Sequence, residues 1–192
     1  MKLLHLLLRQ SGSLLDYTNV GRLSGLSRHT VKAHVEAMNA AHAVFLLAPF
    51  QGGGRREITH RSKCYSFDTG FVTFVKGWDS IREDDRGLLW KHLVLDTLRA
   101  VVDNHNLFYW RDKSGREVDF VVKRKVDQTE AIECKINPDY FDPANLMVFR
   151  SIYTEGGNYV LSPLIKSSYQ RRYGKLQVQF ISIKQLFEWT GE

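Results

Sequence analysis

Residues 115–136 read GREVDFVVKRKVDQTEAIECKI, and charged and apolar side chains alternate in two stretches of this segment. Side chains along a β-strand point to opposite faces in turn, so this alternation predicts two strands. In the first strand Glu117 and Asp119 share one face, and in the second Glu133 and Lys135 share one face. If the strands are neighbours in a sheet, Asp119, Glu133 and Lys135 lie close together.

Carboxylates gathered in this way repel each other unless a cation lies between them. A Mg²⁺ held by Asp119 and Glu133, with Lys135 beside it, would stabilise charge on a phosphate and on an attacking water. We therefore expect a magnesium-dependent, phosphodiester-cleaving site with Asp119, Glu133 and Lys135 as its catalytic residues. Glu117 is either a second acid of this site or the solvated start of its strand.

The order Asp119, Glu133, Lys135 resembles the PD-(D/E)xK, or restriction-endonuclease-like, nuclease superfamily. The flanking sequence is more specific: Phe-Tyr-Trp-Arg at residues 108–111, before the Gly-x-Glu-Val-Asp-Phe stretch, resembles the C-terminal region of a prokaryotic family of AAA-type ATPases. The Asp-Thr-Gly turn at residues 68–70 fits the same family. The resemblance extends from about residue 14 to about residue 161 of the 192.

In that family an ATPase domain precedes a winged helix and a restriction-endonuclease-like domain of unknown function. The resemblance implies an α/β fold with a winged helix-turn-helix domain over residues 1–76. A restriction-endonuclease-like mixed sheet flanked by helices follows over residues 77–192. It also implies a partner, a AAA-type ATPase domain or subunit. No nucleotide is expected on this chain, because Gly-Gly-Gly-Arg at residues 52–55 lacks the lysine and spacing of a phosphate-binding loop.

The first core helix of the family carries a Gly-x-Leu-x-Glu-x-x-Val pattern, and residues 87–94 match it except at the glutamate, where Lys91 stands. A lysine in place of a metal ligand disfavours a two-metal site and leaves a one-metal site open. The alternative is a degenerate nuclease fold in which Asp119 pairs with Lys135 and Glu133 with Lys91. The fold then serves as a non-catalytic interaction module that docks an ATPase or forms a homo-oligomer.

The N-terminal third predicts a winged helix, with helices over residues 2–10, 17–24 and 28–41 and strands over 44–47 and 63–67. Residues 1–70 carry nine Lys and Arg against four Asp and Glu, whereas residues 71–192 carry 18 against 17. Because polyanions bind where positive charge collects, we expect this part to contact duplex DNA. The candidate contacts lie at the third helix and in the loop between the strands: Ser27, Arg28, His29, Lys32, Arg55 and Arg56. A solvated basic face or a protein-docking surface is the alternative.

The C-terminal part predicts an αβββαβ order with further elements at its end. The expected helices cover residues 86–102, 142–157 and 183–189, the expected strands cover 108–111, 116–122, 129–136, 159–161 and 176–181, and a basic loop is expected over 166–175. The chain is 43% hydrophobic and 25% charged, which is typical of a globular protein. No run of roughly 20 apolar residues predicts a membrane span, and Cys64 and Cys134 fit reduced thiols of a cytoplasmic protein.

Overall fold

The structure of the chain, a computed structural model, describes residues 2–52, 61–125 and 127–189. The chain divides into two compact units. Unit 1 comprises residues 1–48 and 60–82, and unit 2 comprises residues 49–59 and 83–192. Among the helices of the described ranges, none is both long and apolar enough to cross a bilayer.

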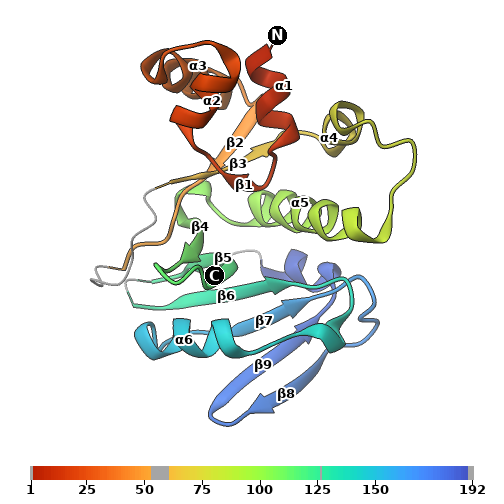
Figure 1. Ribbon diagram of the computed structural model, residues 1–192. Coiled ribbons are helices and arrows are strands. Elements are labelled where there is room, and N and C mark those ends of the chain that lie inside the picture. The colour runs from red at the N-terminus through yellow and green to blue at the C-terminus, as the bar shows by residue number, and fades with distance from the viewer. Residues whose placement is uncertain (1, 53–60, 126, 190–192) are drawn as a thin grey trace. The chain divides into compact units, whose positions relative to one another are not determined.

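Within its described residues, unit 1 combines helices with a small antiparallel sheet (Figure 1). Its helices are α1 (Lys2–Arg9), α2 (Tyr17–Ser24), α3 (Arg28–Ala40) and α4 (Thr69–Lys76). Its strands, in spatial order, are β1 (Ser13–Leu14), β3 (Lys63–Ser66) and β2 (Val44–Leu47). Helices α1 to α3 bury an apolar cluster against this sheet, and Val20, Val31 and Val35 within it are fully buried.

Local start and stop signals set the helix ends of unit 1. The Asp16 carboxylate accepts hydrogen bonds from the backbone N–H groups of Thr18 and Asn19, both at 3.0 Å, and so begins α2. Gly25, at a φ of 76°, ends that helix in the left-handed conformation that favours glycine. The hydroxyl of Ser27 then accepts from the backbone of Thr30 at 3.1 Å and begins α3.

Helix α4 corrects one prediction. From the sequence, residues 68–70 are interpreted as a turn that follows the strand over residues 63–67, and no helix is assigned to the residues that come next. In the structure the Asp68 carboxylate accepts from the N–H of Gly70 at 2.5 Å and caps the N-terminus of α4. Gly77, at a φ of 66°, ends the helix. The Asp-Thr-Gly stretch is therefore a helix start, because a capping carboxylate satisfies the first free N–H groups of a helix.

Unit 2 is built on a mixed six-stranded sheet whose strand order is β4-β5-β6-β7-β9-β8. Its strands are β4 (Leu107–Arg111), β5 (Glu117–Lys123), β6 (Thr129–Cys134), β7 (Asn158–Leu161), β8 (Tyr169–Tyr173) and β9 (Leu176–Ile181). The longer helices are α5 (Glu83–Val101) and α6 (Ala144–Ile152), and short 3-10 helices are η1 (Asn104–Asn106), η2 (Pro138–Tyr140) and η3 (Ile183–Trp189). Strands β6, β7 and β9 run parallel, and the other neighbouring pairs are antiparallel.

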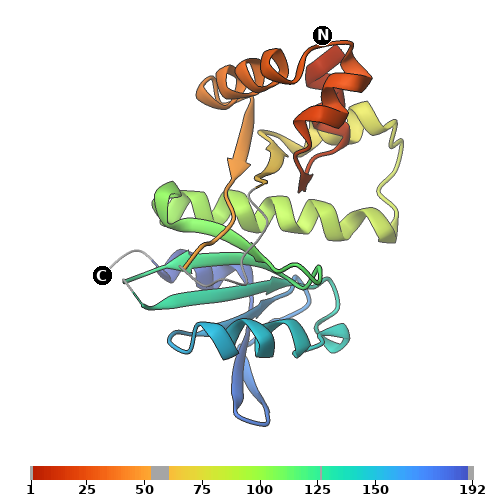
Figure 2. The same cartoon turned by 60° about the vertical axis from the view of Figure 1, so that its left-hand side comes forward.

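Helices α5 and α6 cover opposite faces of this sheet in both ribbon views (Figures 1 and 2). On the α6 side, Phe149 packs edge-on against Trp110 of β4, with ring centroids 5.4 Å apart. On the α5 side, the indole N–H of Trp90 donates to the carbonyl of Leu161 in β7 at 3.0 Å. The ring contact of Phe149 and the hydrogen bond of Trp90 fix both helices on the sheet.

Three elements of unit 2 differ from the prediction. The basic stretch expected to be a loop contains the edge strand β8, because an exposed strand needs no apolar face. The helix expected over residues 142–157 ends at Ile152, and β6 ends at Cys134 rather than at residue 136. Lys135 therefore lies just beyond the end of its strand.

Arg150 of α6 joins that helix to the chain segments beside β6 and β7. Its guanidinium donates to the carbonyls of Thr129 at 2.8 Å, Glu155 at 2.8 Å and Gly157 at 2.6 Å, and to the side chain of Asn158 at 2.6 Å. A planar fork with five donors suits this set of acceptors.

Replacing Arg150 with Ala should lower the free energy of unfolding by about 3 kcal/mol or more, because several partly buried carbonyls would lose their donor. Arg150→Lys should restore only part of this loss, since an ammonium cannot reach all four acceptors. Urea unfolding would measure both effects. As a control, Arg86→Ala, at an exposed position of α5, should change the free energy of unfolding by no more than about 0.5 kcal/mol. Equal losses in Arg150→Ala and Arg86→Ala would show that the hydrogen bonds of Arg150 do not stabilise the fold.

Candidate functional site

The candidate site lies where β5 departs from regular pairing. The register of β5 against β4 shifts by one residue, so that Asp119 and Phe120 both lie opposite Tyr109. This extra residue is a β-bulge, a distortion that re-aims side chains and is frequent beside active sites. The strict alternation predicted for this strand is therefore wrong at Asp119: Val118 and Val121, three residues apart, belong to the same buried cluster.

Asp119 is buried and connects three elements. One of its carboxylate oxygens, Oδ1, forms an ion pair with the ammonium of Lys91 on α5. The other, Oδ2, accepts a hydrogen bond from the backbone N–H of Cys134 in β6 at 3.0 Å. Phe120 of β5 pairs with Ile132 of β6, and this hydrogen bond lies next to that pair in the sheet. Asp119 thus holds the strands and α5 together at one point.

The pairing of the lysines differs from the alternative that the sequence suggests. Lys91 pairs with Asp119, whereas the Lys135 ammonium lies 3.5 Å from Oε2 of Glu133. The reason is placement: Lys91 reaches Asp119 from α5, and Lys135 is two residues from Glu133 along the chain. Burial lowers the pKa of Lys91, but the charge of Asp119 and its hydrogen bond outweigh burial and raise this pKa above its usual value. Lys91 is therefore a fixed positive charge.

Glu133 is buried beside this ion pair, with 5% of its surface exposed. Burial, and then the negative charge of Asp119, raise the pKa of Glu133 to about 8, although Lys135 and Lys91 oppose the shift. Its Oε1 atom has no hydrogen-bond partner within the described part of the chain. The raised pKa favours the neutral, protonated form of Glu133, and the charge of Asp119 is compensated by Lys91.

Glu117 lies at the start of β5 in a cross-strand pair with Arg111 of β4, whose Nη1 is 2.9 Å from Oε2 of Glu117. Of the two readings of Glu117, a site acid and the solvated start of a strand, this contact favours the strand end. Its side chain is only about one-fifth exposed, so the carboxylate is shielded by its partner rather than fully solvated.

The acids of the cluster do not fit a divalent cation as they stand. Across residues 2–52, 61–125 and 127–189, no group of three or more His, Cys, Asp or Glu side chains is placed to hold a metal ion. Of the two expected ligands, Asp119 has its oxygens on Lys91 and on the N–H of Cys134, and the raised pKa of Glu133 favours its protonated form. A Mg²⁺ ion, which needs several ionised or carbonyl oxygens, would have to displace an ammonium and a proton together.

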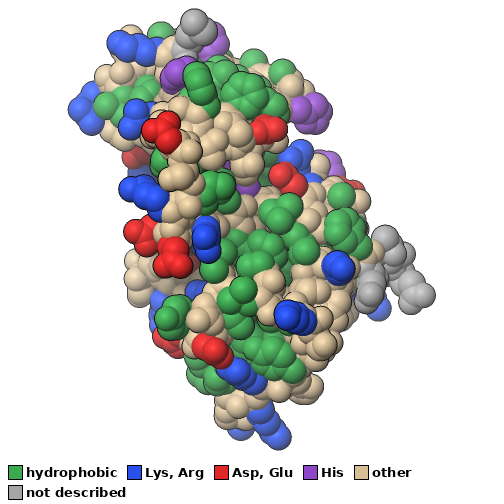
Figure 3. Space-filling view, turned by 90° about the vertical axis from the view of Figure 1, so that its right-hand side faces the viewer, with side chains coloured by type: hydrophobic (Ala, Val, Ile, Leu, Met, Phe, Trp, Pro, Cys, Tyr) green, Lys and Arg blue, Asp and Glu red, His purple; other side chains and the backbone are tan. Residues whose placement is uncertain are grey.

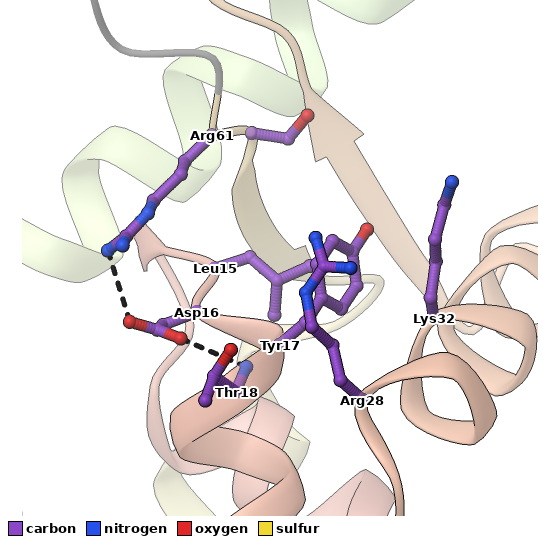
Figure 4. Close-up of a pocket in the computed structure, with 8 residues that line it drawn as sticks. Leu15, Asp16, Tyr17, Thr18, Arg28, Lys32 and Arg61 are labelled. Carbon is purple, nitrogen blue, oxygen red and sulfur yellow. Dashed lines mark hydrogen bonds and ion pairs between the residues drawn. The ribbon is translucent and has the colours of Figure 1, made fainter.

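A second, basic site lies entirely within unit 1. Arg28 and Lys32 of α3 and Arg61, which precedes β3, border a pocket of about 450 Å³ beside Tyr17 (Figure 4). Arg61 also pairs with Asp16 at 3.1 Å. Burial raises the pKa of Tyr17, so its hydroxyl keeps its proton and can donate a hydrogen bond into the pocket.

The candidate DNA-contact residues differ in where they lie in the structure. Arg28 and Lys32 lie together at the pocket, and His29 is exposed on the same helix. Ser27 is occupied as the cap of α3. Arg55 and Arg56 lie outside the described residues. Sequence reasoning did not identify Arg61, since a single arginine before a strand carries no recognisable spacing.

The raised pKa of Glu133 predicts a pH dependence of stability. Between pH 4.5, the ordinary value, and about pH 8, the folded chain holds a proton that the unfolded chain has lost. The contribution of this proton to the free energy of unfolding is fully present below pH 4.5. It decreases as pH rises from 4.5 to about 8, at up to about 1.4 kcal/mol per pH unit, and is lost above pH 8. The difference in unfolding free energy between wild type and Glu133→Gln should therefore fall from pH 5 to pH 8.

Chemical denaturation at four pH values would measure this difference. In an Asp119→Asn background the fall should shrink, because the charge of Asp119 contributes to the shift. A difference that stays constant with pH would show that Glu133 is ionised in the folded chain.

Comparison with known proteins places the chain among proteins of unknown function. Residues 86–186 match a family described as Domain of unknown function (DUF4143), a domain often found with AAA ATPases, and residues 1–82 match Domain of unknown function (DUF8612). Similar proteins include "Uncharacterized protein Mb2031c" of Mycobacterium bovis and "Uncharacterized protein Rv2008c" of Mycobacterium tuberculosis. Each is 28% identical over 117 residues, which cover 58% of this chain and 26% of the relative, so the chain spans about a quarter of their length. Because the match over residues 86–186 covers more than half of the 192 residues, this chain belongs to the DUF4143 family.

Proposed function

We propose that this chain is a cytoplasmic DNA-binding protein with a nuclease-like site that Lys91 keeps free of metal. Unit 1 acts as a winged helix-turn-helix that holds duplex DNA. Unit 2 is a PD-(D/E)xK, restriction-endonuclease-like domain. The observation that carries the proposal is the cluster of Asp119, Glu133 and Lys135 at the end of two adjacent strands, with Lys91 of α5 in contact with Asp119.

The arrangement of unit 1 supports the DNA-binding part. Three helices are followed by the antiparallel pair β2 and β3, the order of a winged helix. Arg28, Lys32 and Arg61 border one pocket with the hydroxyl of Tyr17 beside them, and guanidinium and ammonium groups are the usual partners of DNA phosphates. Contacts of this kind fix the position of a protein on duplex DNA without reading its sequence.

The arrangement of unit 2 supports the nuclease-like part. The order α5, β4, β5, β6, α6, β7 is the αβββαβ order expected of this fold, with helices on both faces of a mixed sheet. Mg²⁺ in such a site would polarise the phosphate and generate a hydroxide nucleophile. Here Lys91 and Lys135 supply the positive charge in its place, so the wild-type site can bind a phosphate without an activated water. We therefore propose that wild-type hydrolysis is weak or absent.

The membership in DUF4143 supports a further part of the proposal, a AAA-type ATPase as the partner of this chain, because that domain is often found with AAA ATPases. The same Lys91–Asp119 pair favours a second candidate function, a non-catalytic module that docks an ATPase or self-associates. The two candidates differ in DNA affinity and in the response of the site to a change at Lys91.

The double variant Arg28→Ala/Lys32→Ala should bind a duplex more weakly than wild type, because two phosphate contacts are lost. The slope of log affinity against log salt concentration should fall by about 2. Fluorescence anisotropy with a labelled duplex at several salt concentrations would measure both quantities. Arg55→Ala/Arg56→Ala tests the loop in the same way.

A matched control for this experiment is Lys2→Ala/Arg9→Ala, which removes the same charge from exposed positions of α1. The control should bind nearly as well as wild type. Equal affinity in wild type and in Arg28→Ala/Lys32→Ala would remove the support for DNA binding by α3 and leave the docking module as the better account of unit 1.

The variant Lys91→Glu should bind Mn²⁺ at least about tenfold more tightly than wild type. The change removes the ammonium that occupies Asp119 and adds a carboxylate, a difference of two charge units next to Glu133. Calorimetric titration would measure the affinity, and nicking of plasmid DNA with Mn²⁺ should rise in parallel.

Two controls separate the causes. Lys91→Met removes the charge without adding a ligand, so its Mn²⁺ affinity should lie between those of wild type and Lys91→Glu. Combining Lys91→Glu with Asp119→Asn should abolish the gain. If wild type and Lys91→Glu bind Mn²⁺ equally, residue 91 lies outside the functional site and the nuclease-like assignment is wrong.

A further inference from the structure

The charges of unit 2 are separated along the chain. Residues 83–155 carry 11 Lys and Arg against 14 Asp and Glu, whereas residues 156–187 carry five Lys and Arg and no acid. This C-terminal segment includes β7, β8 and β9. Three of its five cations, Arg171, Arg172 and Lys175, lie on the hairpin of β8 and β9. The nearly neutral net charge of residues 71–192 thus conceals a strongly basic ribbon.

The hairpin extends beyond the rest of the sheet. Strand β9 pairs with β8 along residues 176–180, but it pairs with β7 only from Gln179 onward. The end of the ribbon near its turn therefore has no neighbouring strand, and both ribbon views show it projecting (Figures 1 and 2). In the space-filling view, Lys and Arg side chains lie at this end of unit 2 (Figure 3).

The two faces of the ribbon differ in chemistry. On one face Leu176, Val178 and Phe180 are buried in the core beneath α6. The opposite face is exposed and carries only amides and a guanidinium, from Gln170, Arg172, Gln177 and Gln179. A shallow pocket of about 390 Å³ on the ribbon is lined by three cations and two amides: Gln170, Arg171, Arg172, Lys175 and Gln177.

Of the three cations of this surface, Arg171 is paired with an acid, whereas Arg172 and Lys175 are not, within the ranges that the structure describes. Arg171 lies over the rings of Tyr169 and Phe180, 5.2 Å from each centroid, and 3.2 Å from Asp139. Arg172 donates through Nε to the carbonyl of Gly174 at 3.0 Å, and its side chain is exposed. Among the described residues, neither Arg172 nor Lys175 has an acidic partner within 4 Å. Like charges gathered in this way repel, and a bound anion would offset the repulsion.

A simpler explanation is that charges on β8 prevent edge-to-edge pairing, since β8 is an edge strand of the sheet. That explanation accounts for Arg171 and Arg172. It does not account for Lys175, which lies in the turn, or for the row of amides from Gln170 to Gln177 on the exposed face.

We propose that the β8–β9 ribbon, residues 169–181, is a second contact for the phosphodiester backbone of duplex DNA. The inference rests on the proposed DNA-binding function and adds a surface of unit 2 to it. A guanidinium fork can hold two oxygens of one phosphate, an ammonium holds the next, and glutamine amides contact phosphates or base edges. A two-stranded ribbon also has a width that a major groove admits.

The ribbon is separate from the cluster around Asp119. Strands β6 and β9 are linked through β7 in parallel, and Lys135 follows the C-terminal end of β6, whereas the turn of the ribbon precedes β9. The two therefore lie at opposite ends of the sheet. DNA bound to the ribbon would lie away from the carboxylates of Asp119 and Glu133. Binding by the ribbon therefore does not depend on whether that cluster cleaves DNA.

The test uses the full chain, a labelled duplex of about 30 base pairs and anisotropy between 50 and 300 mM KCl. Arg172→Ala/Lys175→Ala should weaken binding about tenfold at low salt and lower the salt slope by about 2. Arg172→Gln/Lys175→Gln should do the same while keeping polar side chains that can form hydrogen bonds. Arg86→Ala/Lys184→Ala, which removes equal charge from exposed positions of α5 and η3, should stay within twofold of wild type. Circular dichroism confirms that each variant is folded.

Unchanged binding in both ribbon variants overturns the inference and leaves the proposed function intact, provided that Arg28→Ala/Lys32→Ala still weakens binding. A wild-type chain without affinity for DNA overturns both. A competition experiment identifies the anion that the ribbon binds. At equal concentration of negative charge, unlabelled duplex DNA should displace the labelled duplex far better than poly-L-glutamate or inorganic phosphate. Equal displacement by these competitors would overturn the assignment to a phosphodiester backbone.

Discussion

The ion pair between Lys91 and Asp119 determines the electrostatics of unit 2. Two carboxylates, Asp119 and Glu133, are buried side by side, and each would be costly as an isolated charge. The chain resolves this in two ways. Asp119 keeps its charge because Lys91 and the N–H of Cys134 compensate it, and Glu133 is relieved of its charge by a proton. Each solution depends on the other, since the charge of Asp119 helps to raise the pKa of Glu133.

This arrangement requires that α5 be held firmly on the sheet. The residue before Lys91 is Trp90, which is buried and hydrogen-bonded to the backbone of β7. Val94, one turn further along α5, is fully buried. These contacts set the rotation of the helix and so direct the stem of Lys91 toward Asp119. The β-bulge fixes the other partner, because it departs from the regular alternation at Asp119 itself.

Much of this could be predicted from alternation and capping signals, because both are local. Period-two patterns identified the strands β5 and β6, and a capping signal identified the start of α3. The predictions that were wrong concern features that depend on residues far away in the sequence. The bulge arises from the register with β4, and the choice of Lys91 rather than Lys135 as the partner of Asp119 depends on where α5 packs. Strand β8 was missed because an exposed edge strand has no apolar alternation to reveal it.

The identity of residue 91 changes what the fold requires in order to be stable. With a glutamate there, three carboxylates would surround one point, and their repulsion would be relieved only by protons or by a bound cation. With Lys91 the repulsion is already compensated within the chain, so unit 2 can fold without a metal. One side chain thereby puts an ammonium that pairs with Asp119 where a carboxylate would add negative charge to the cluster.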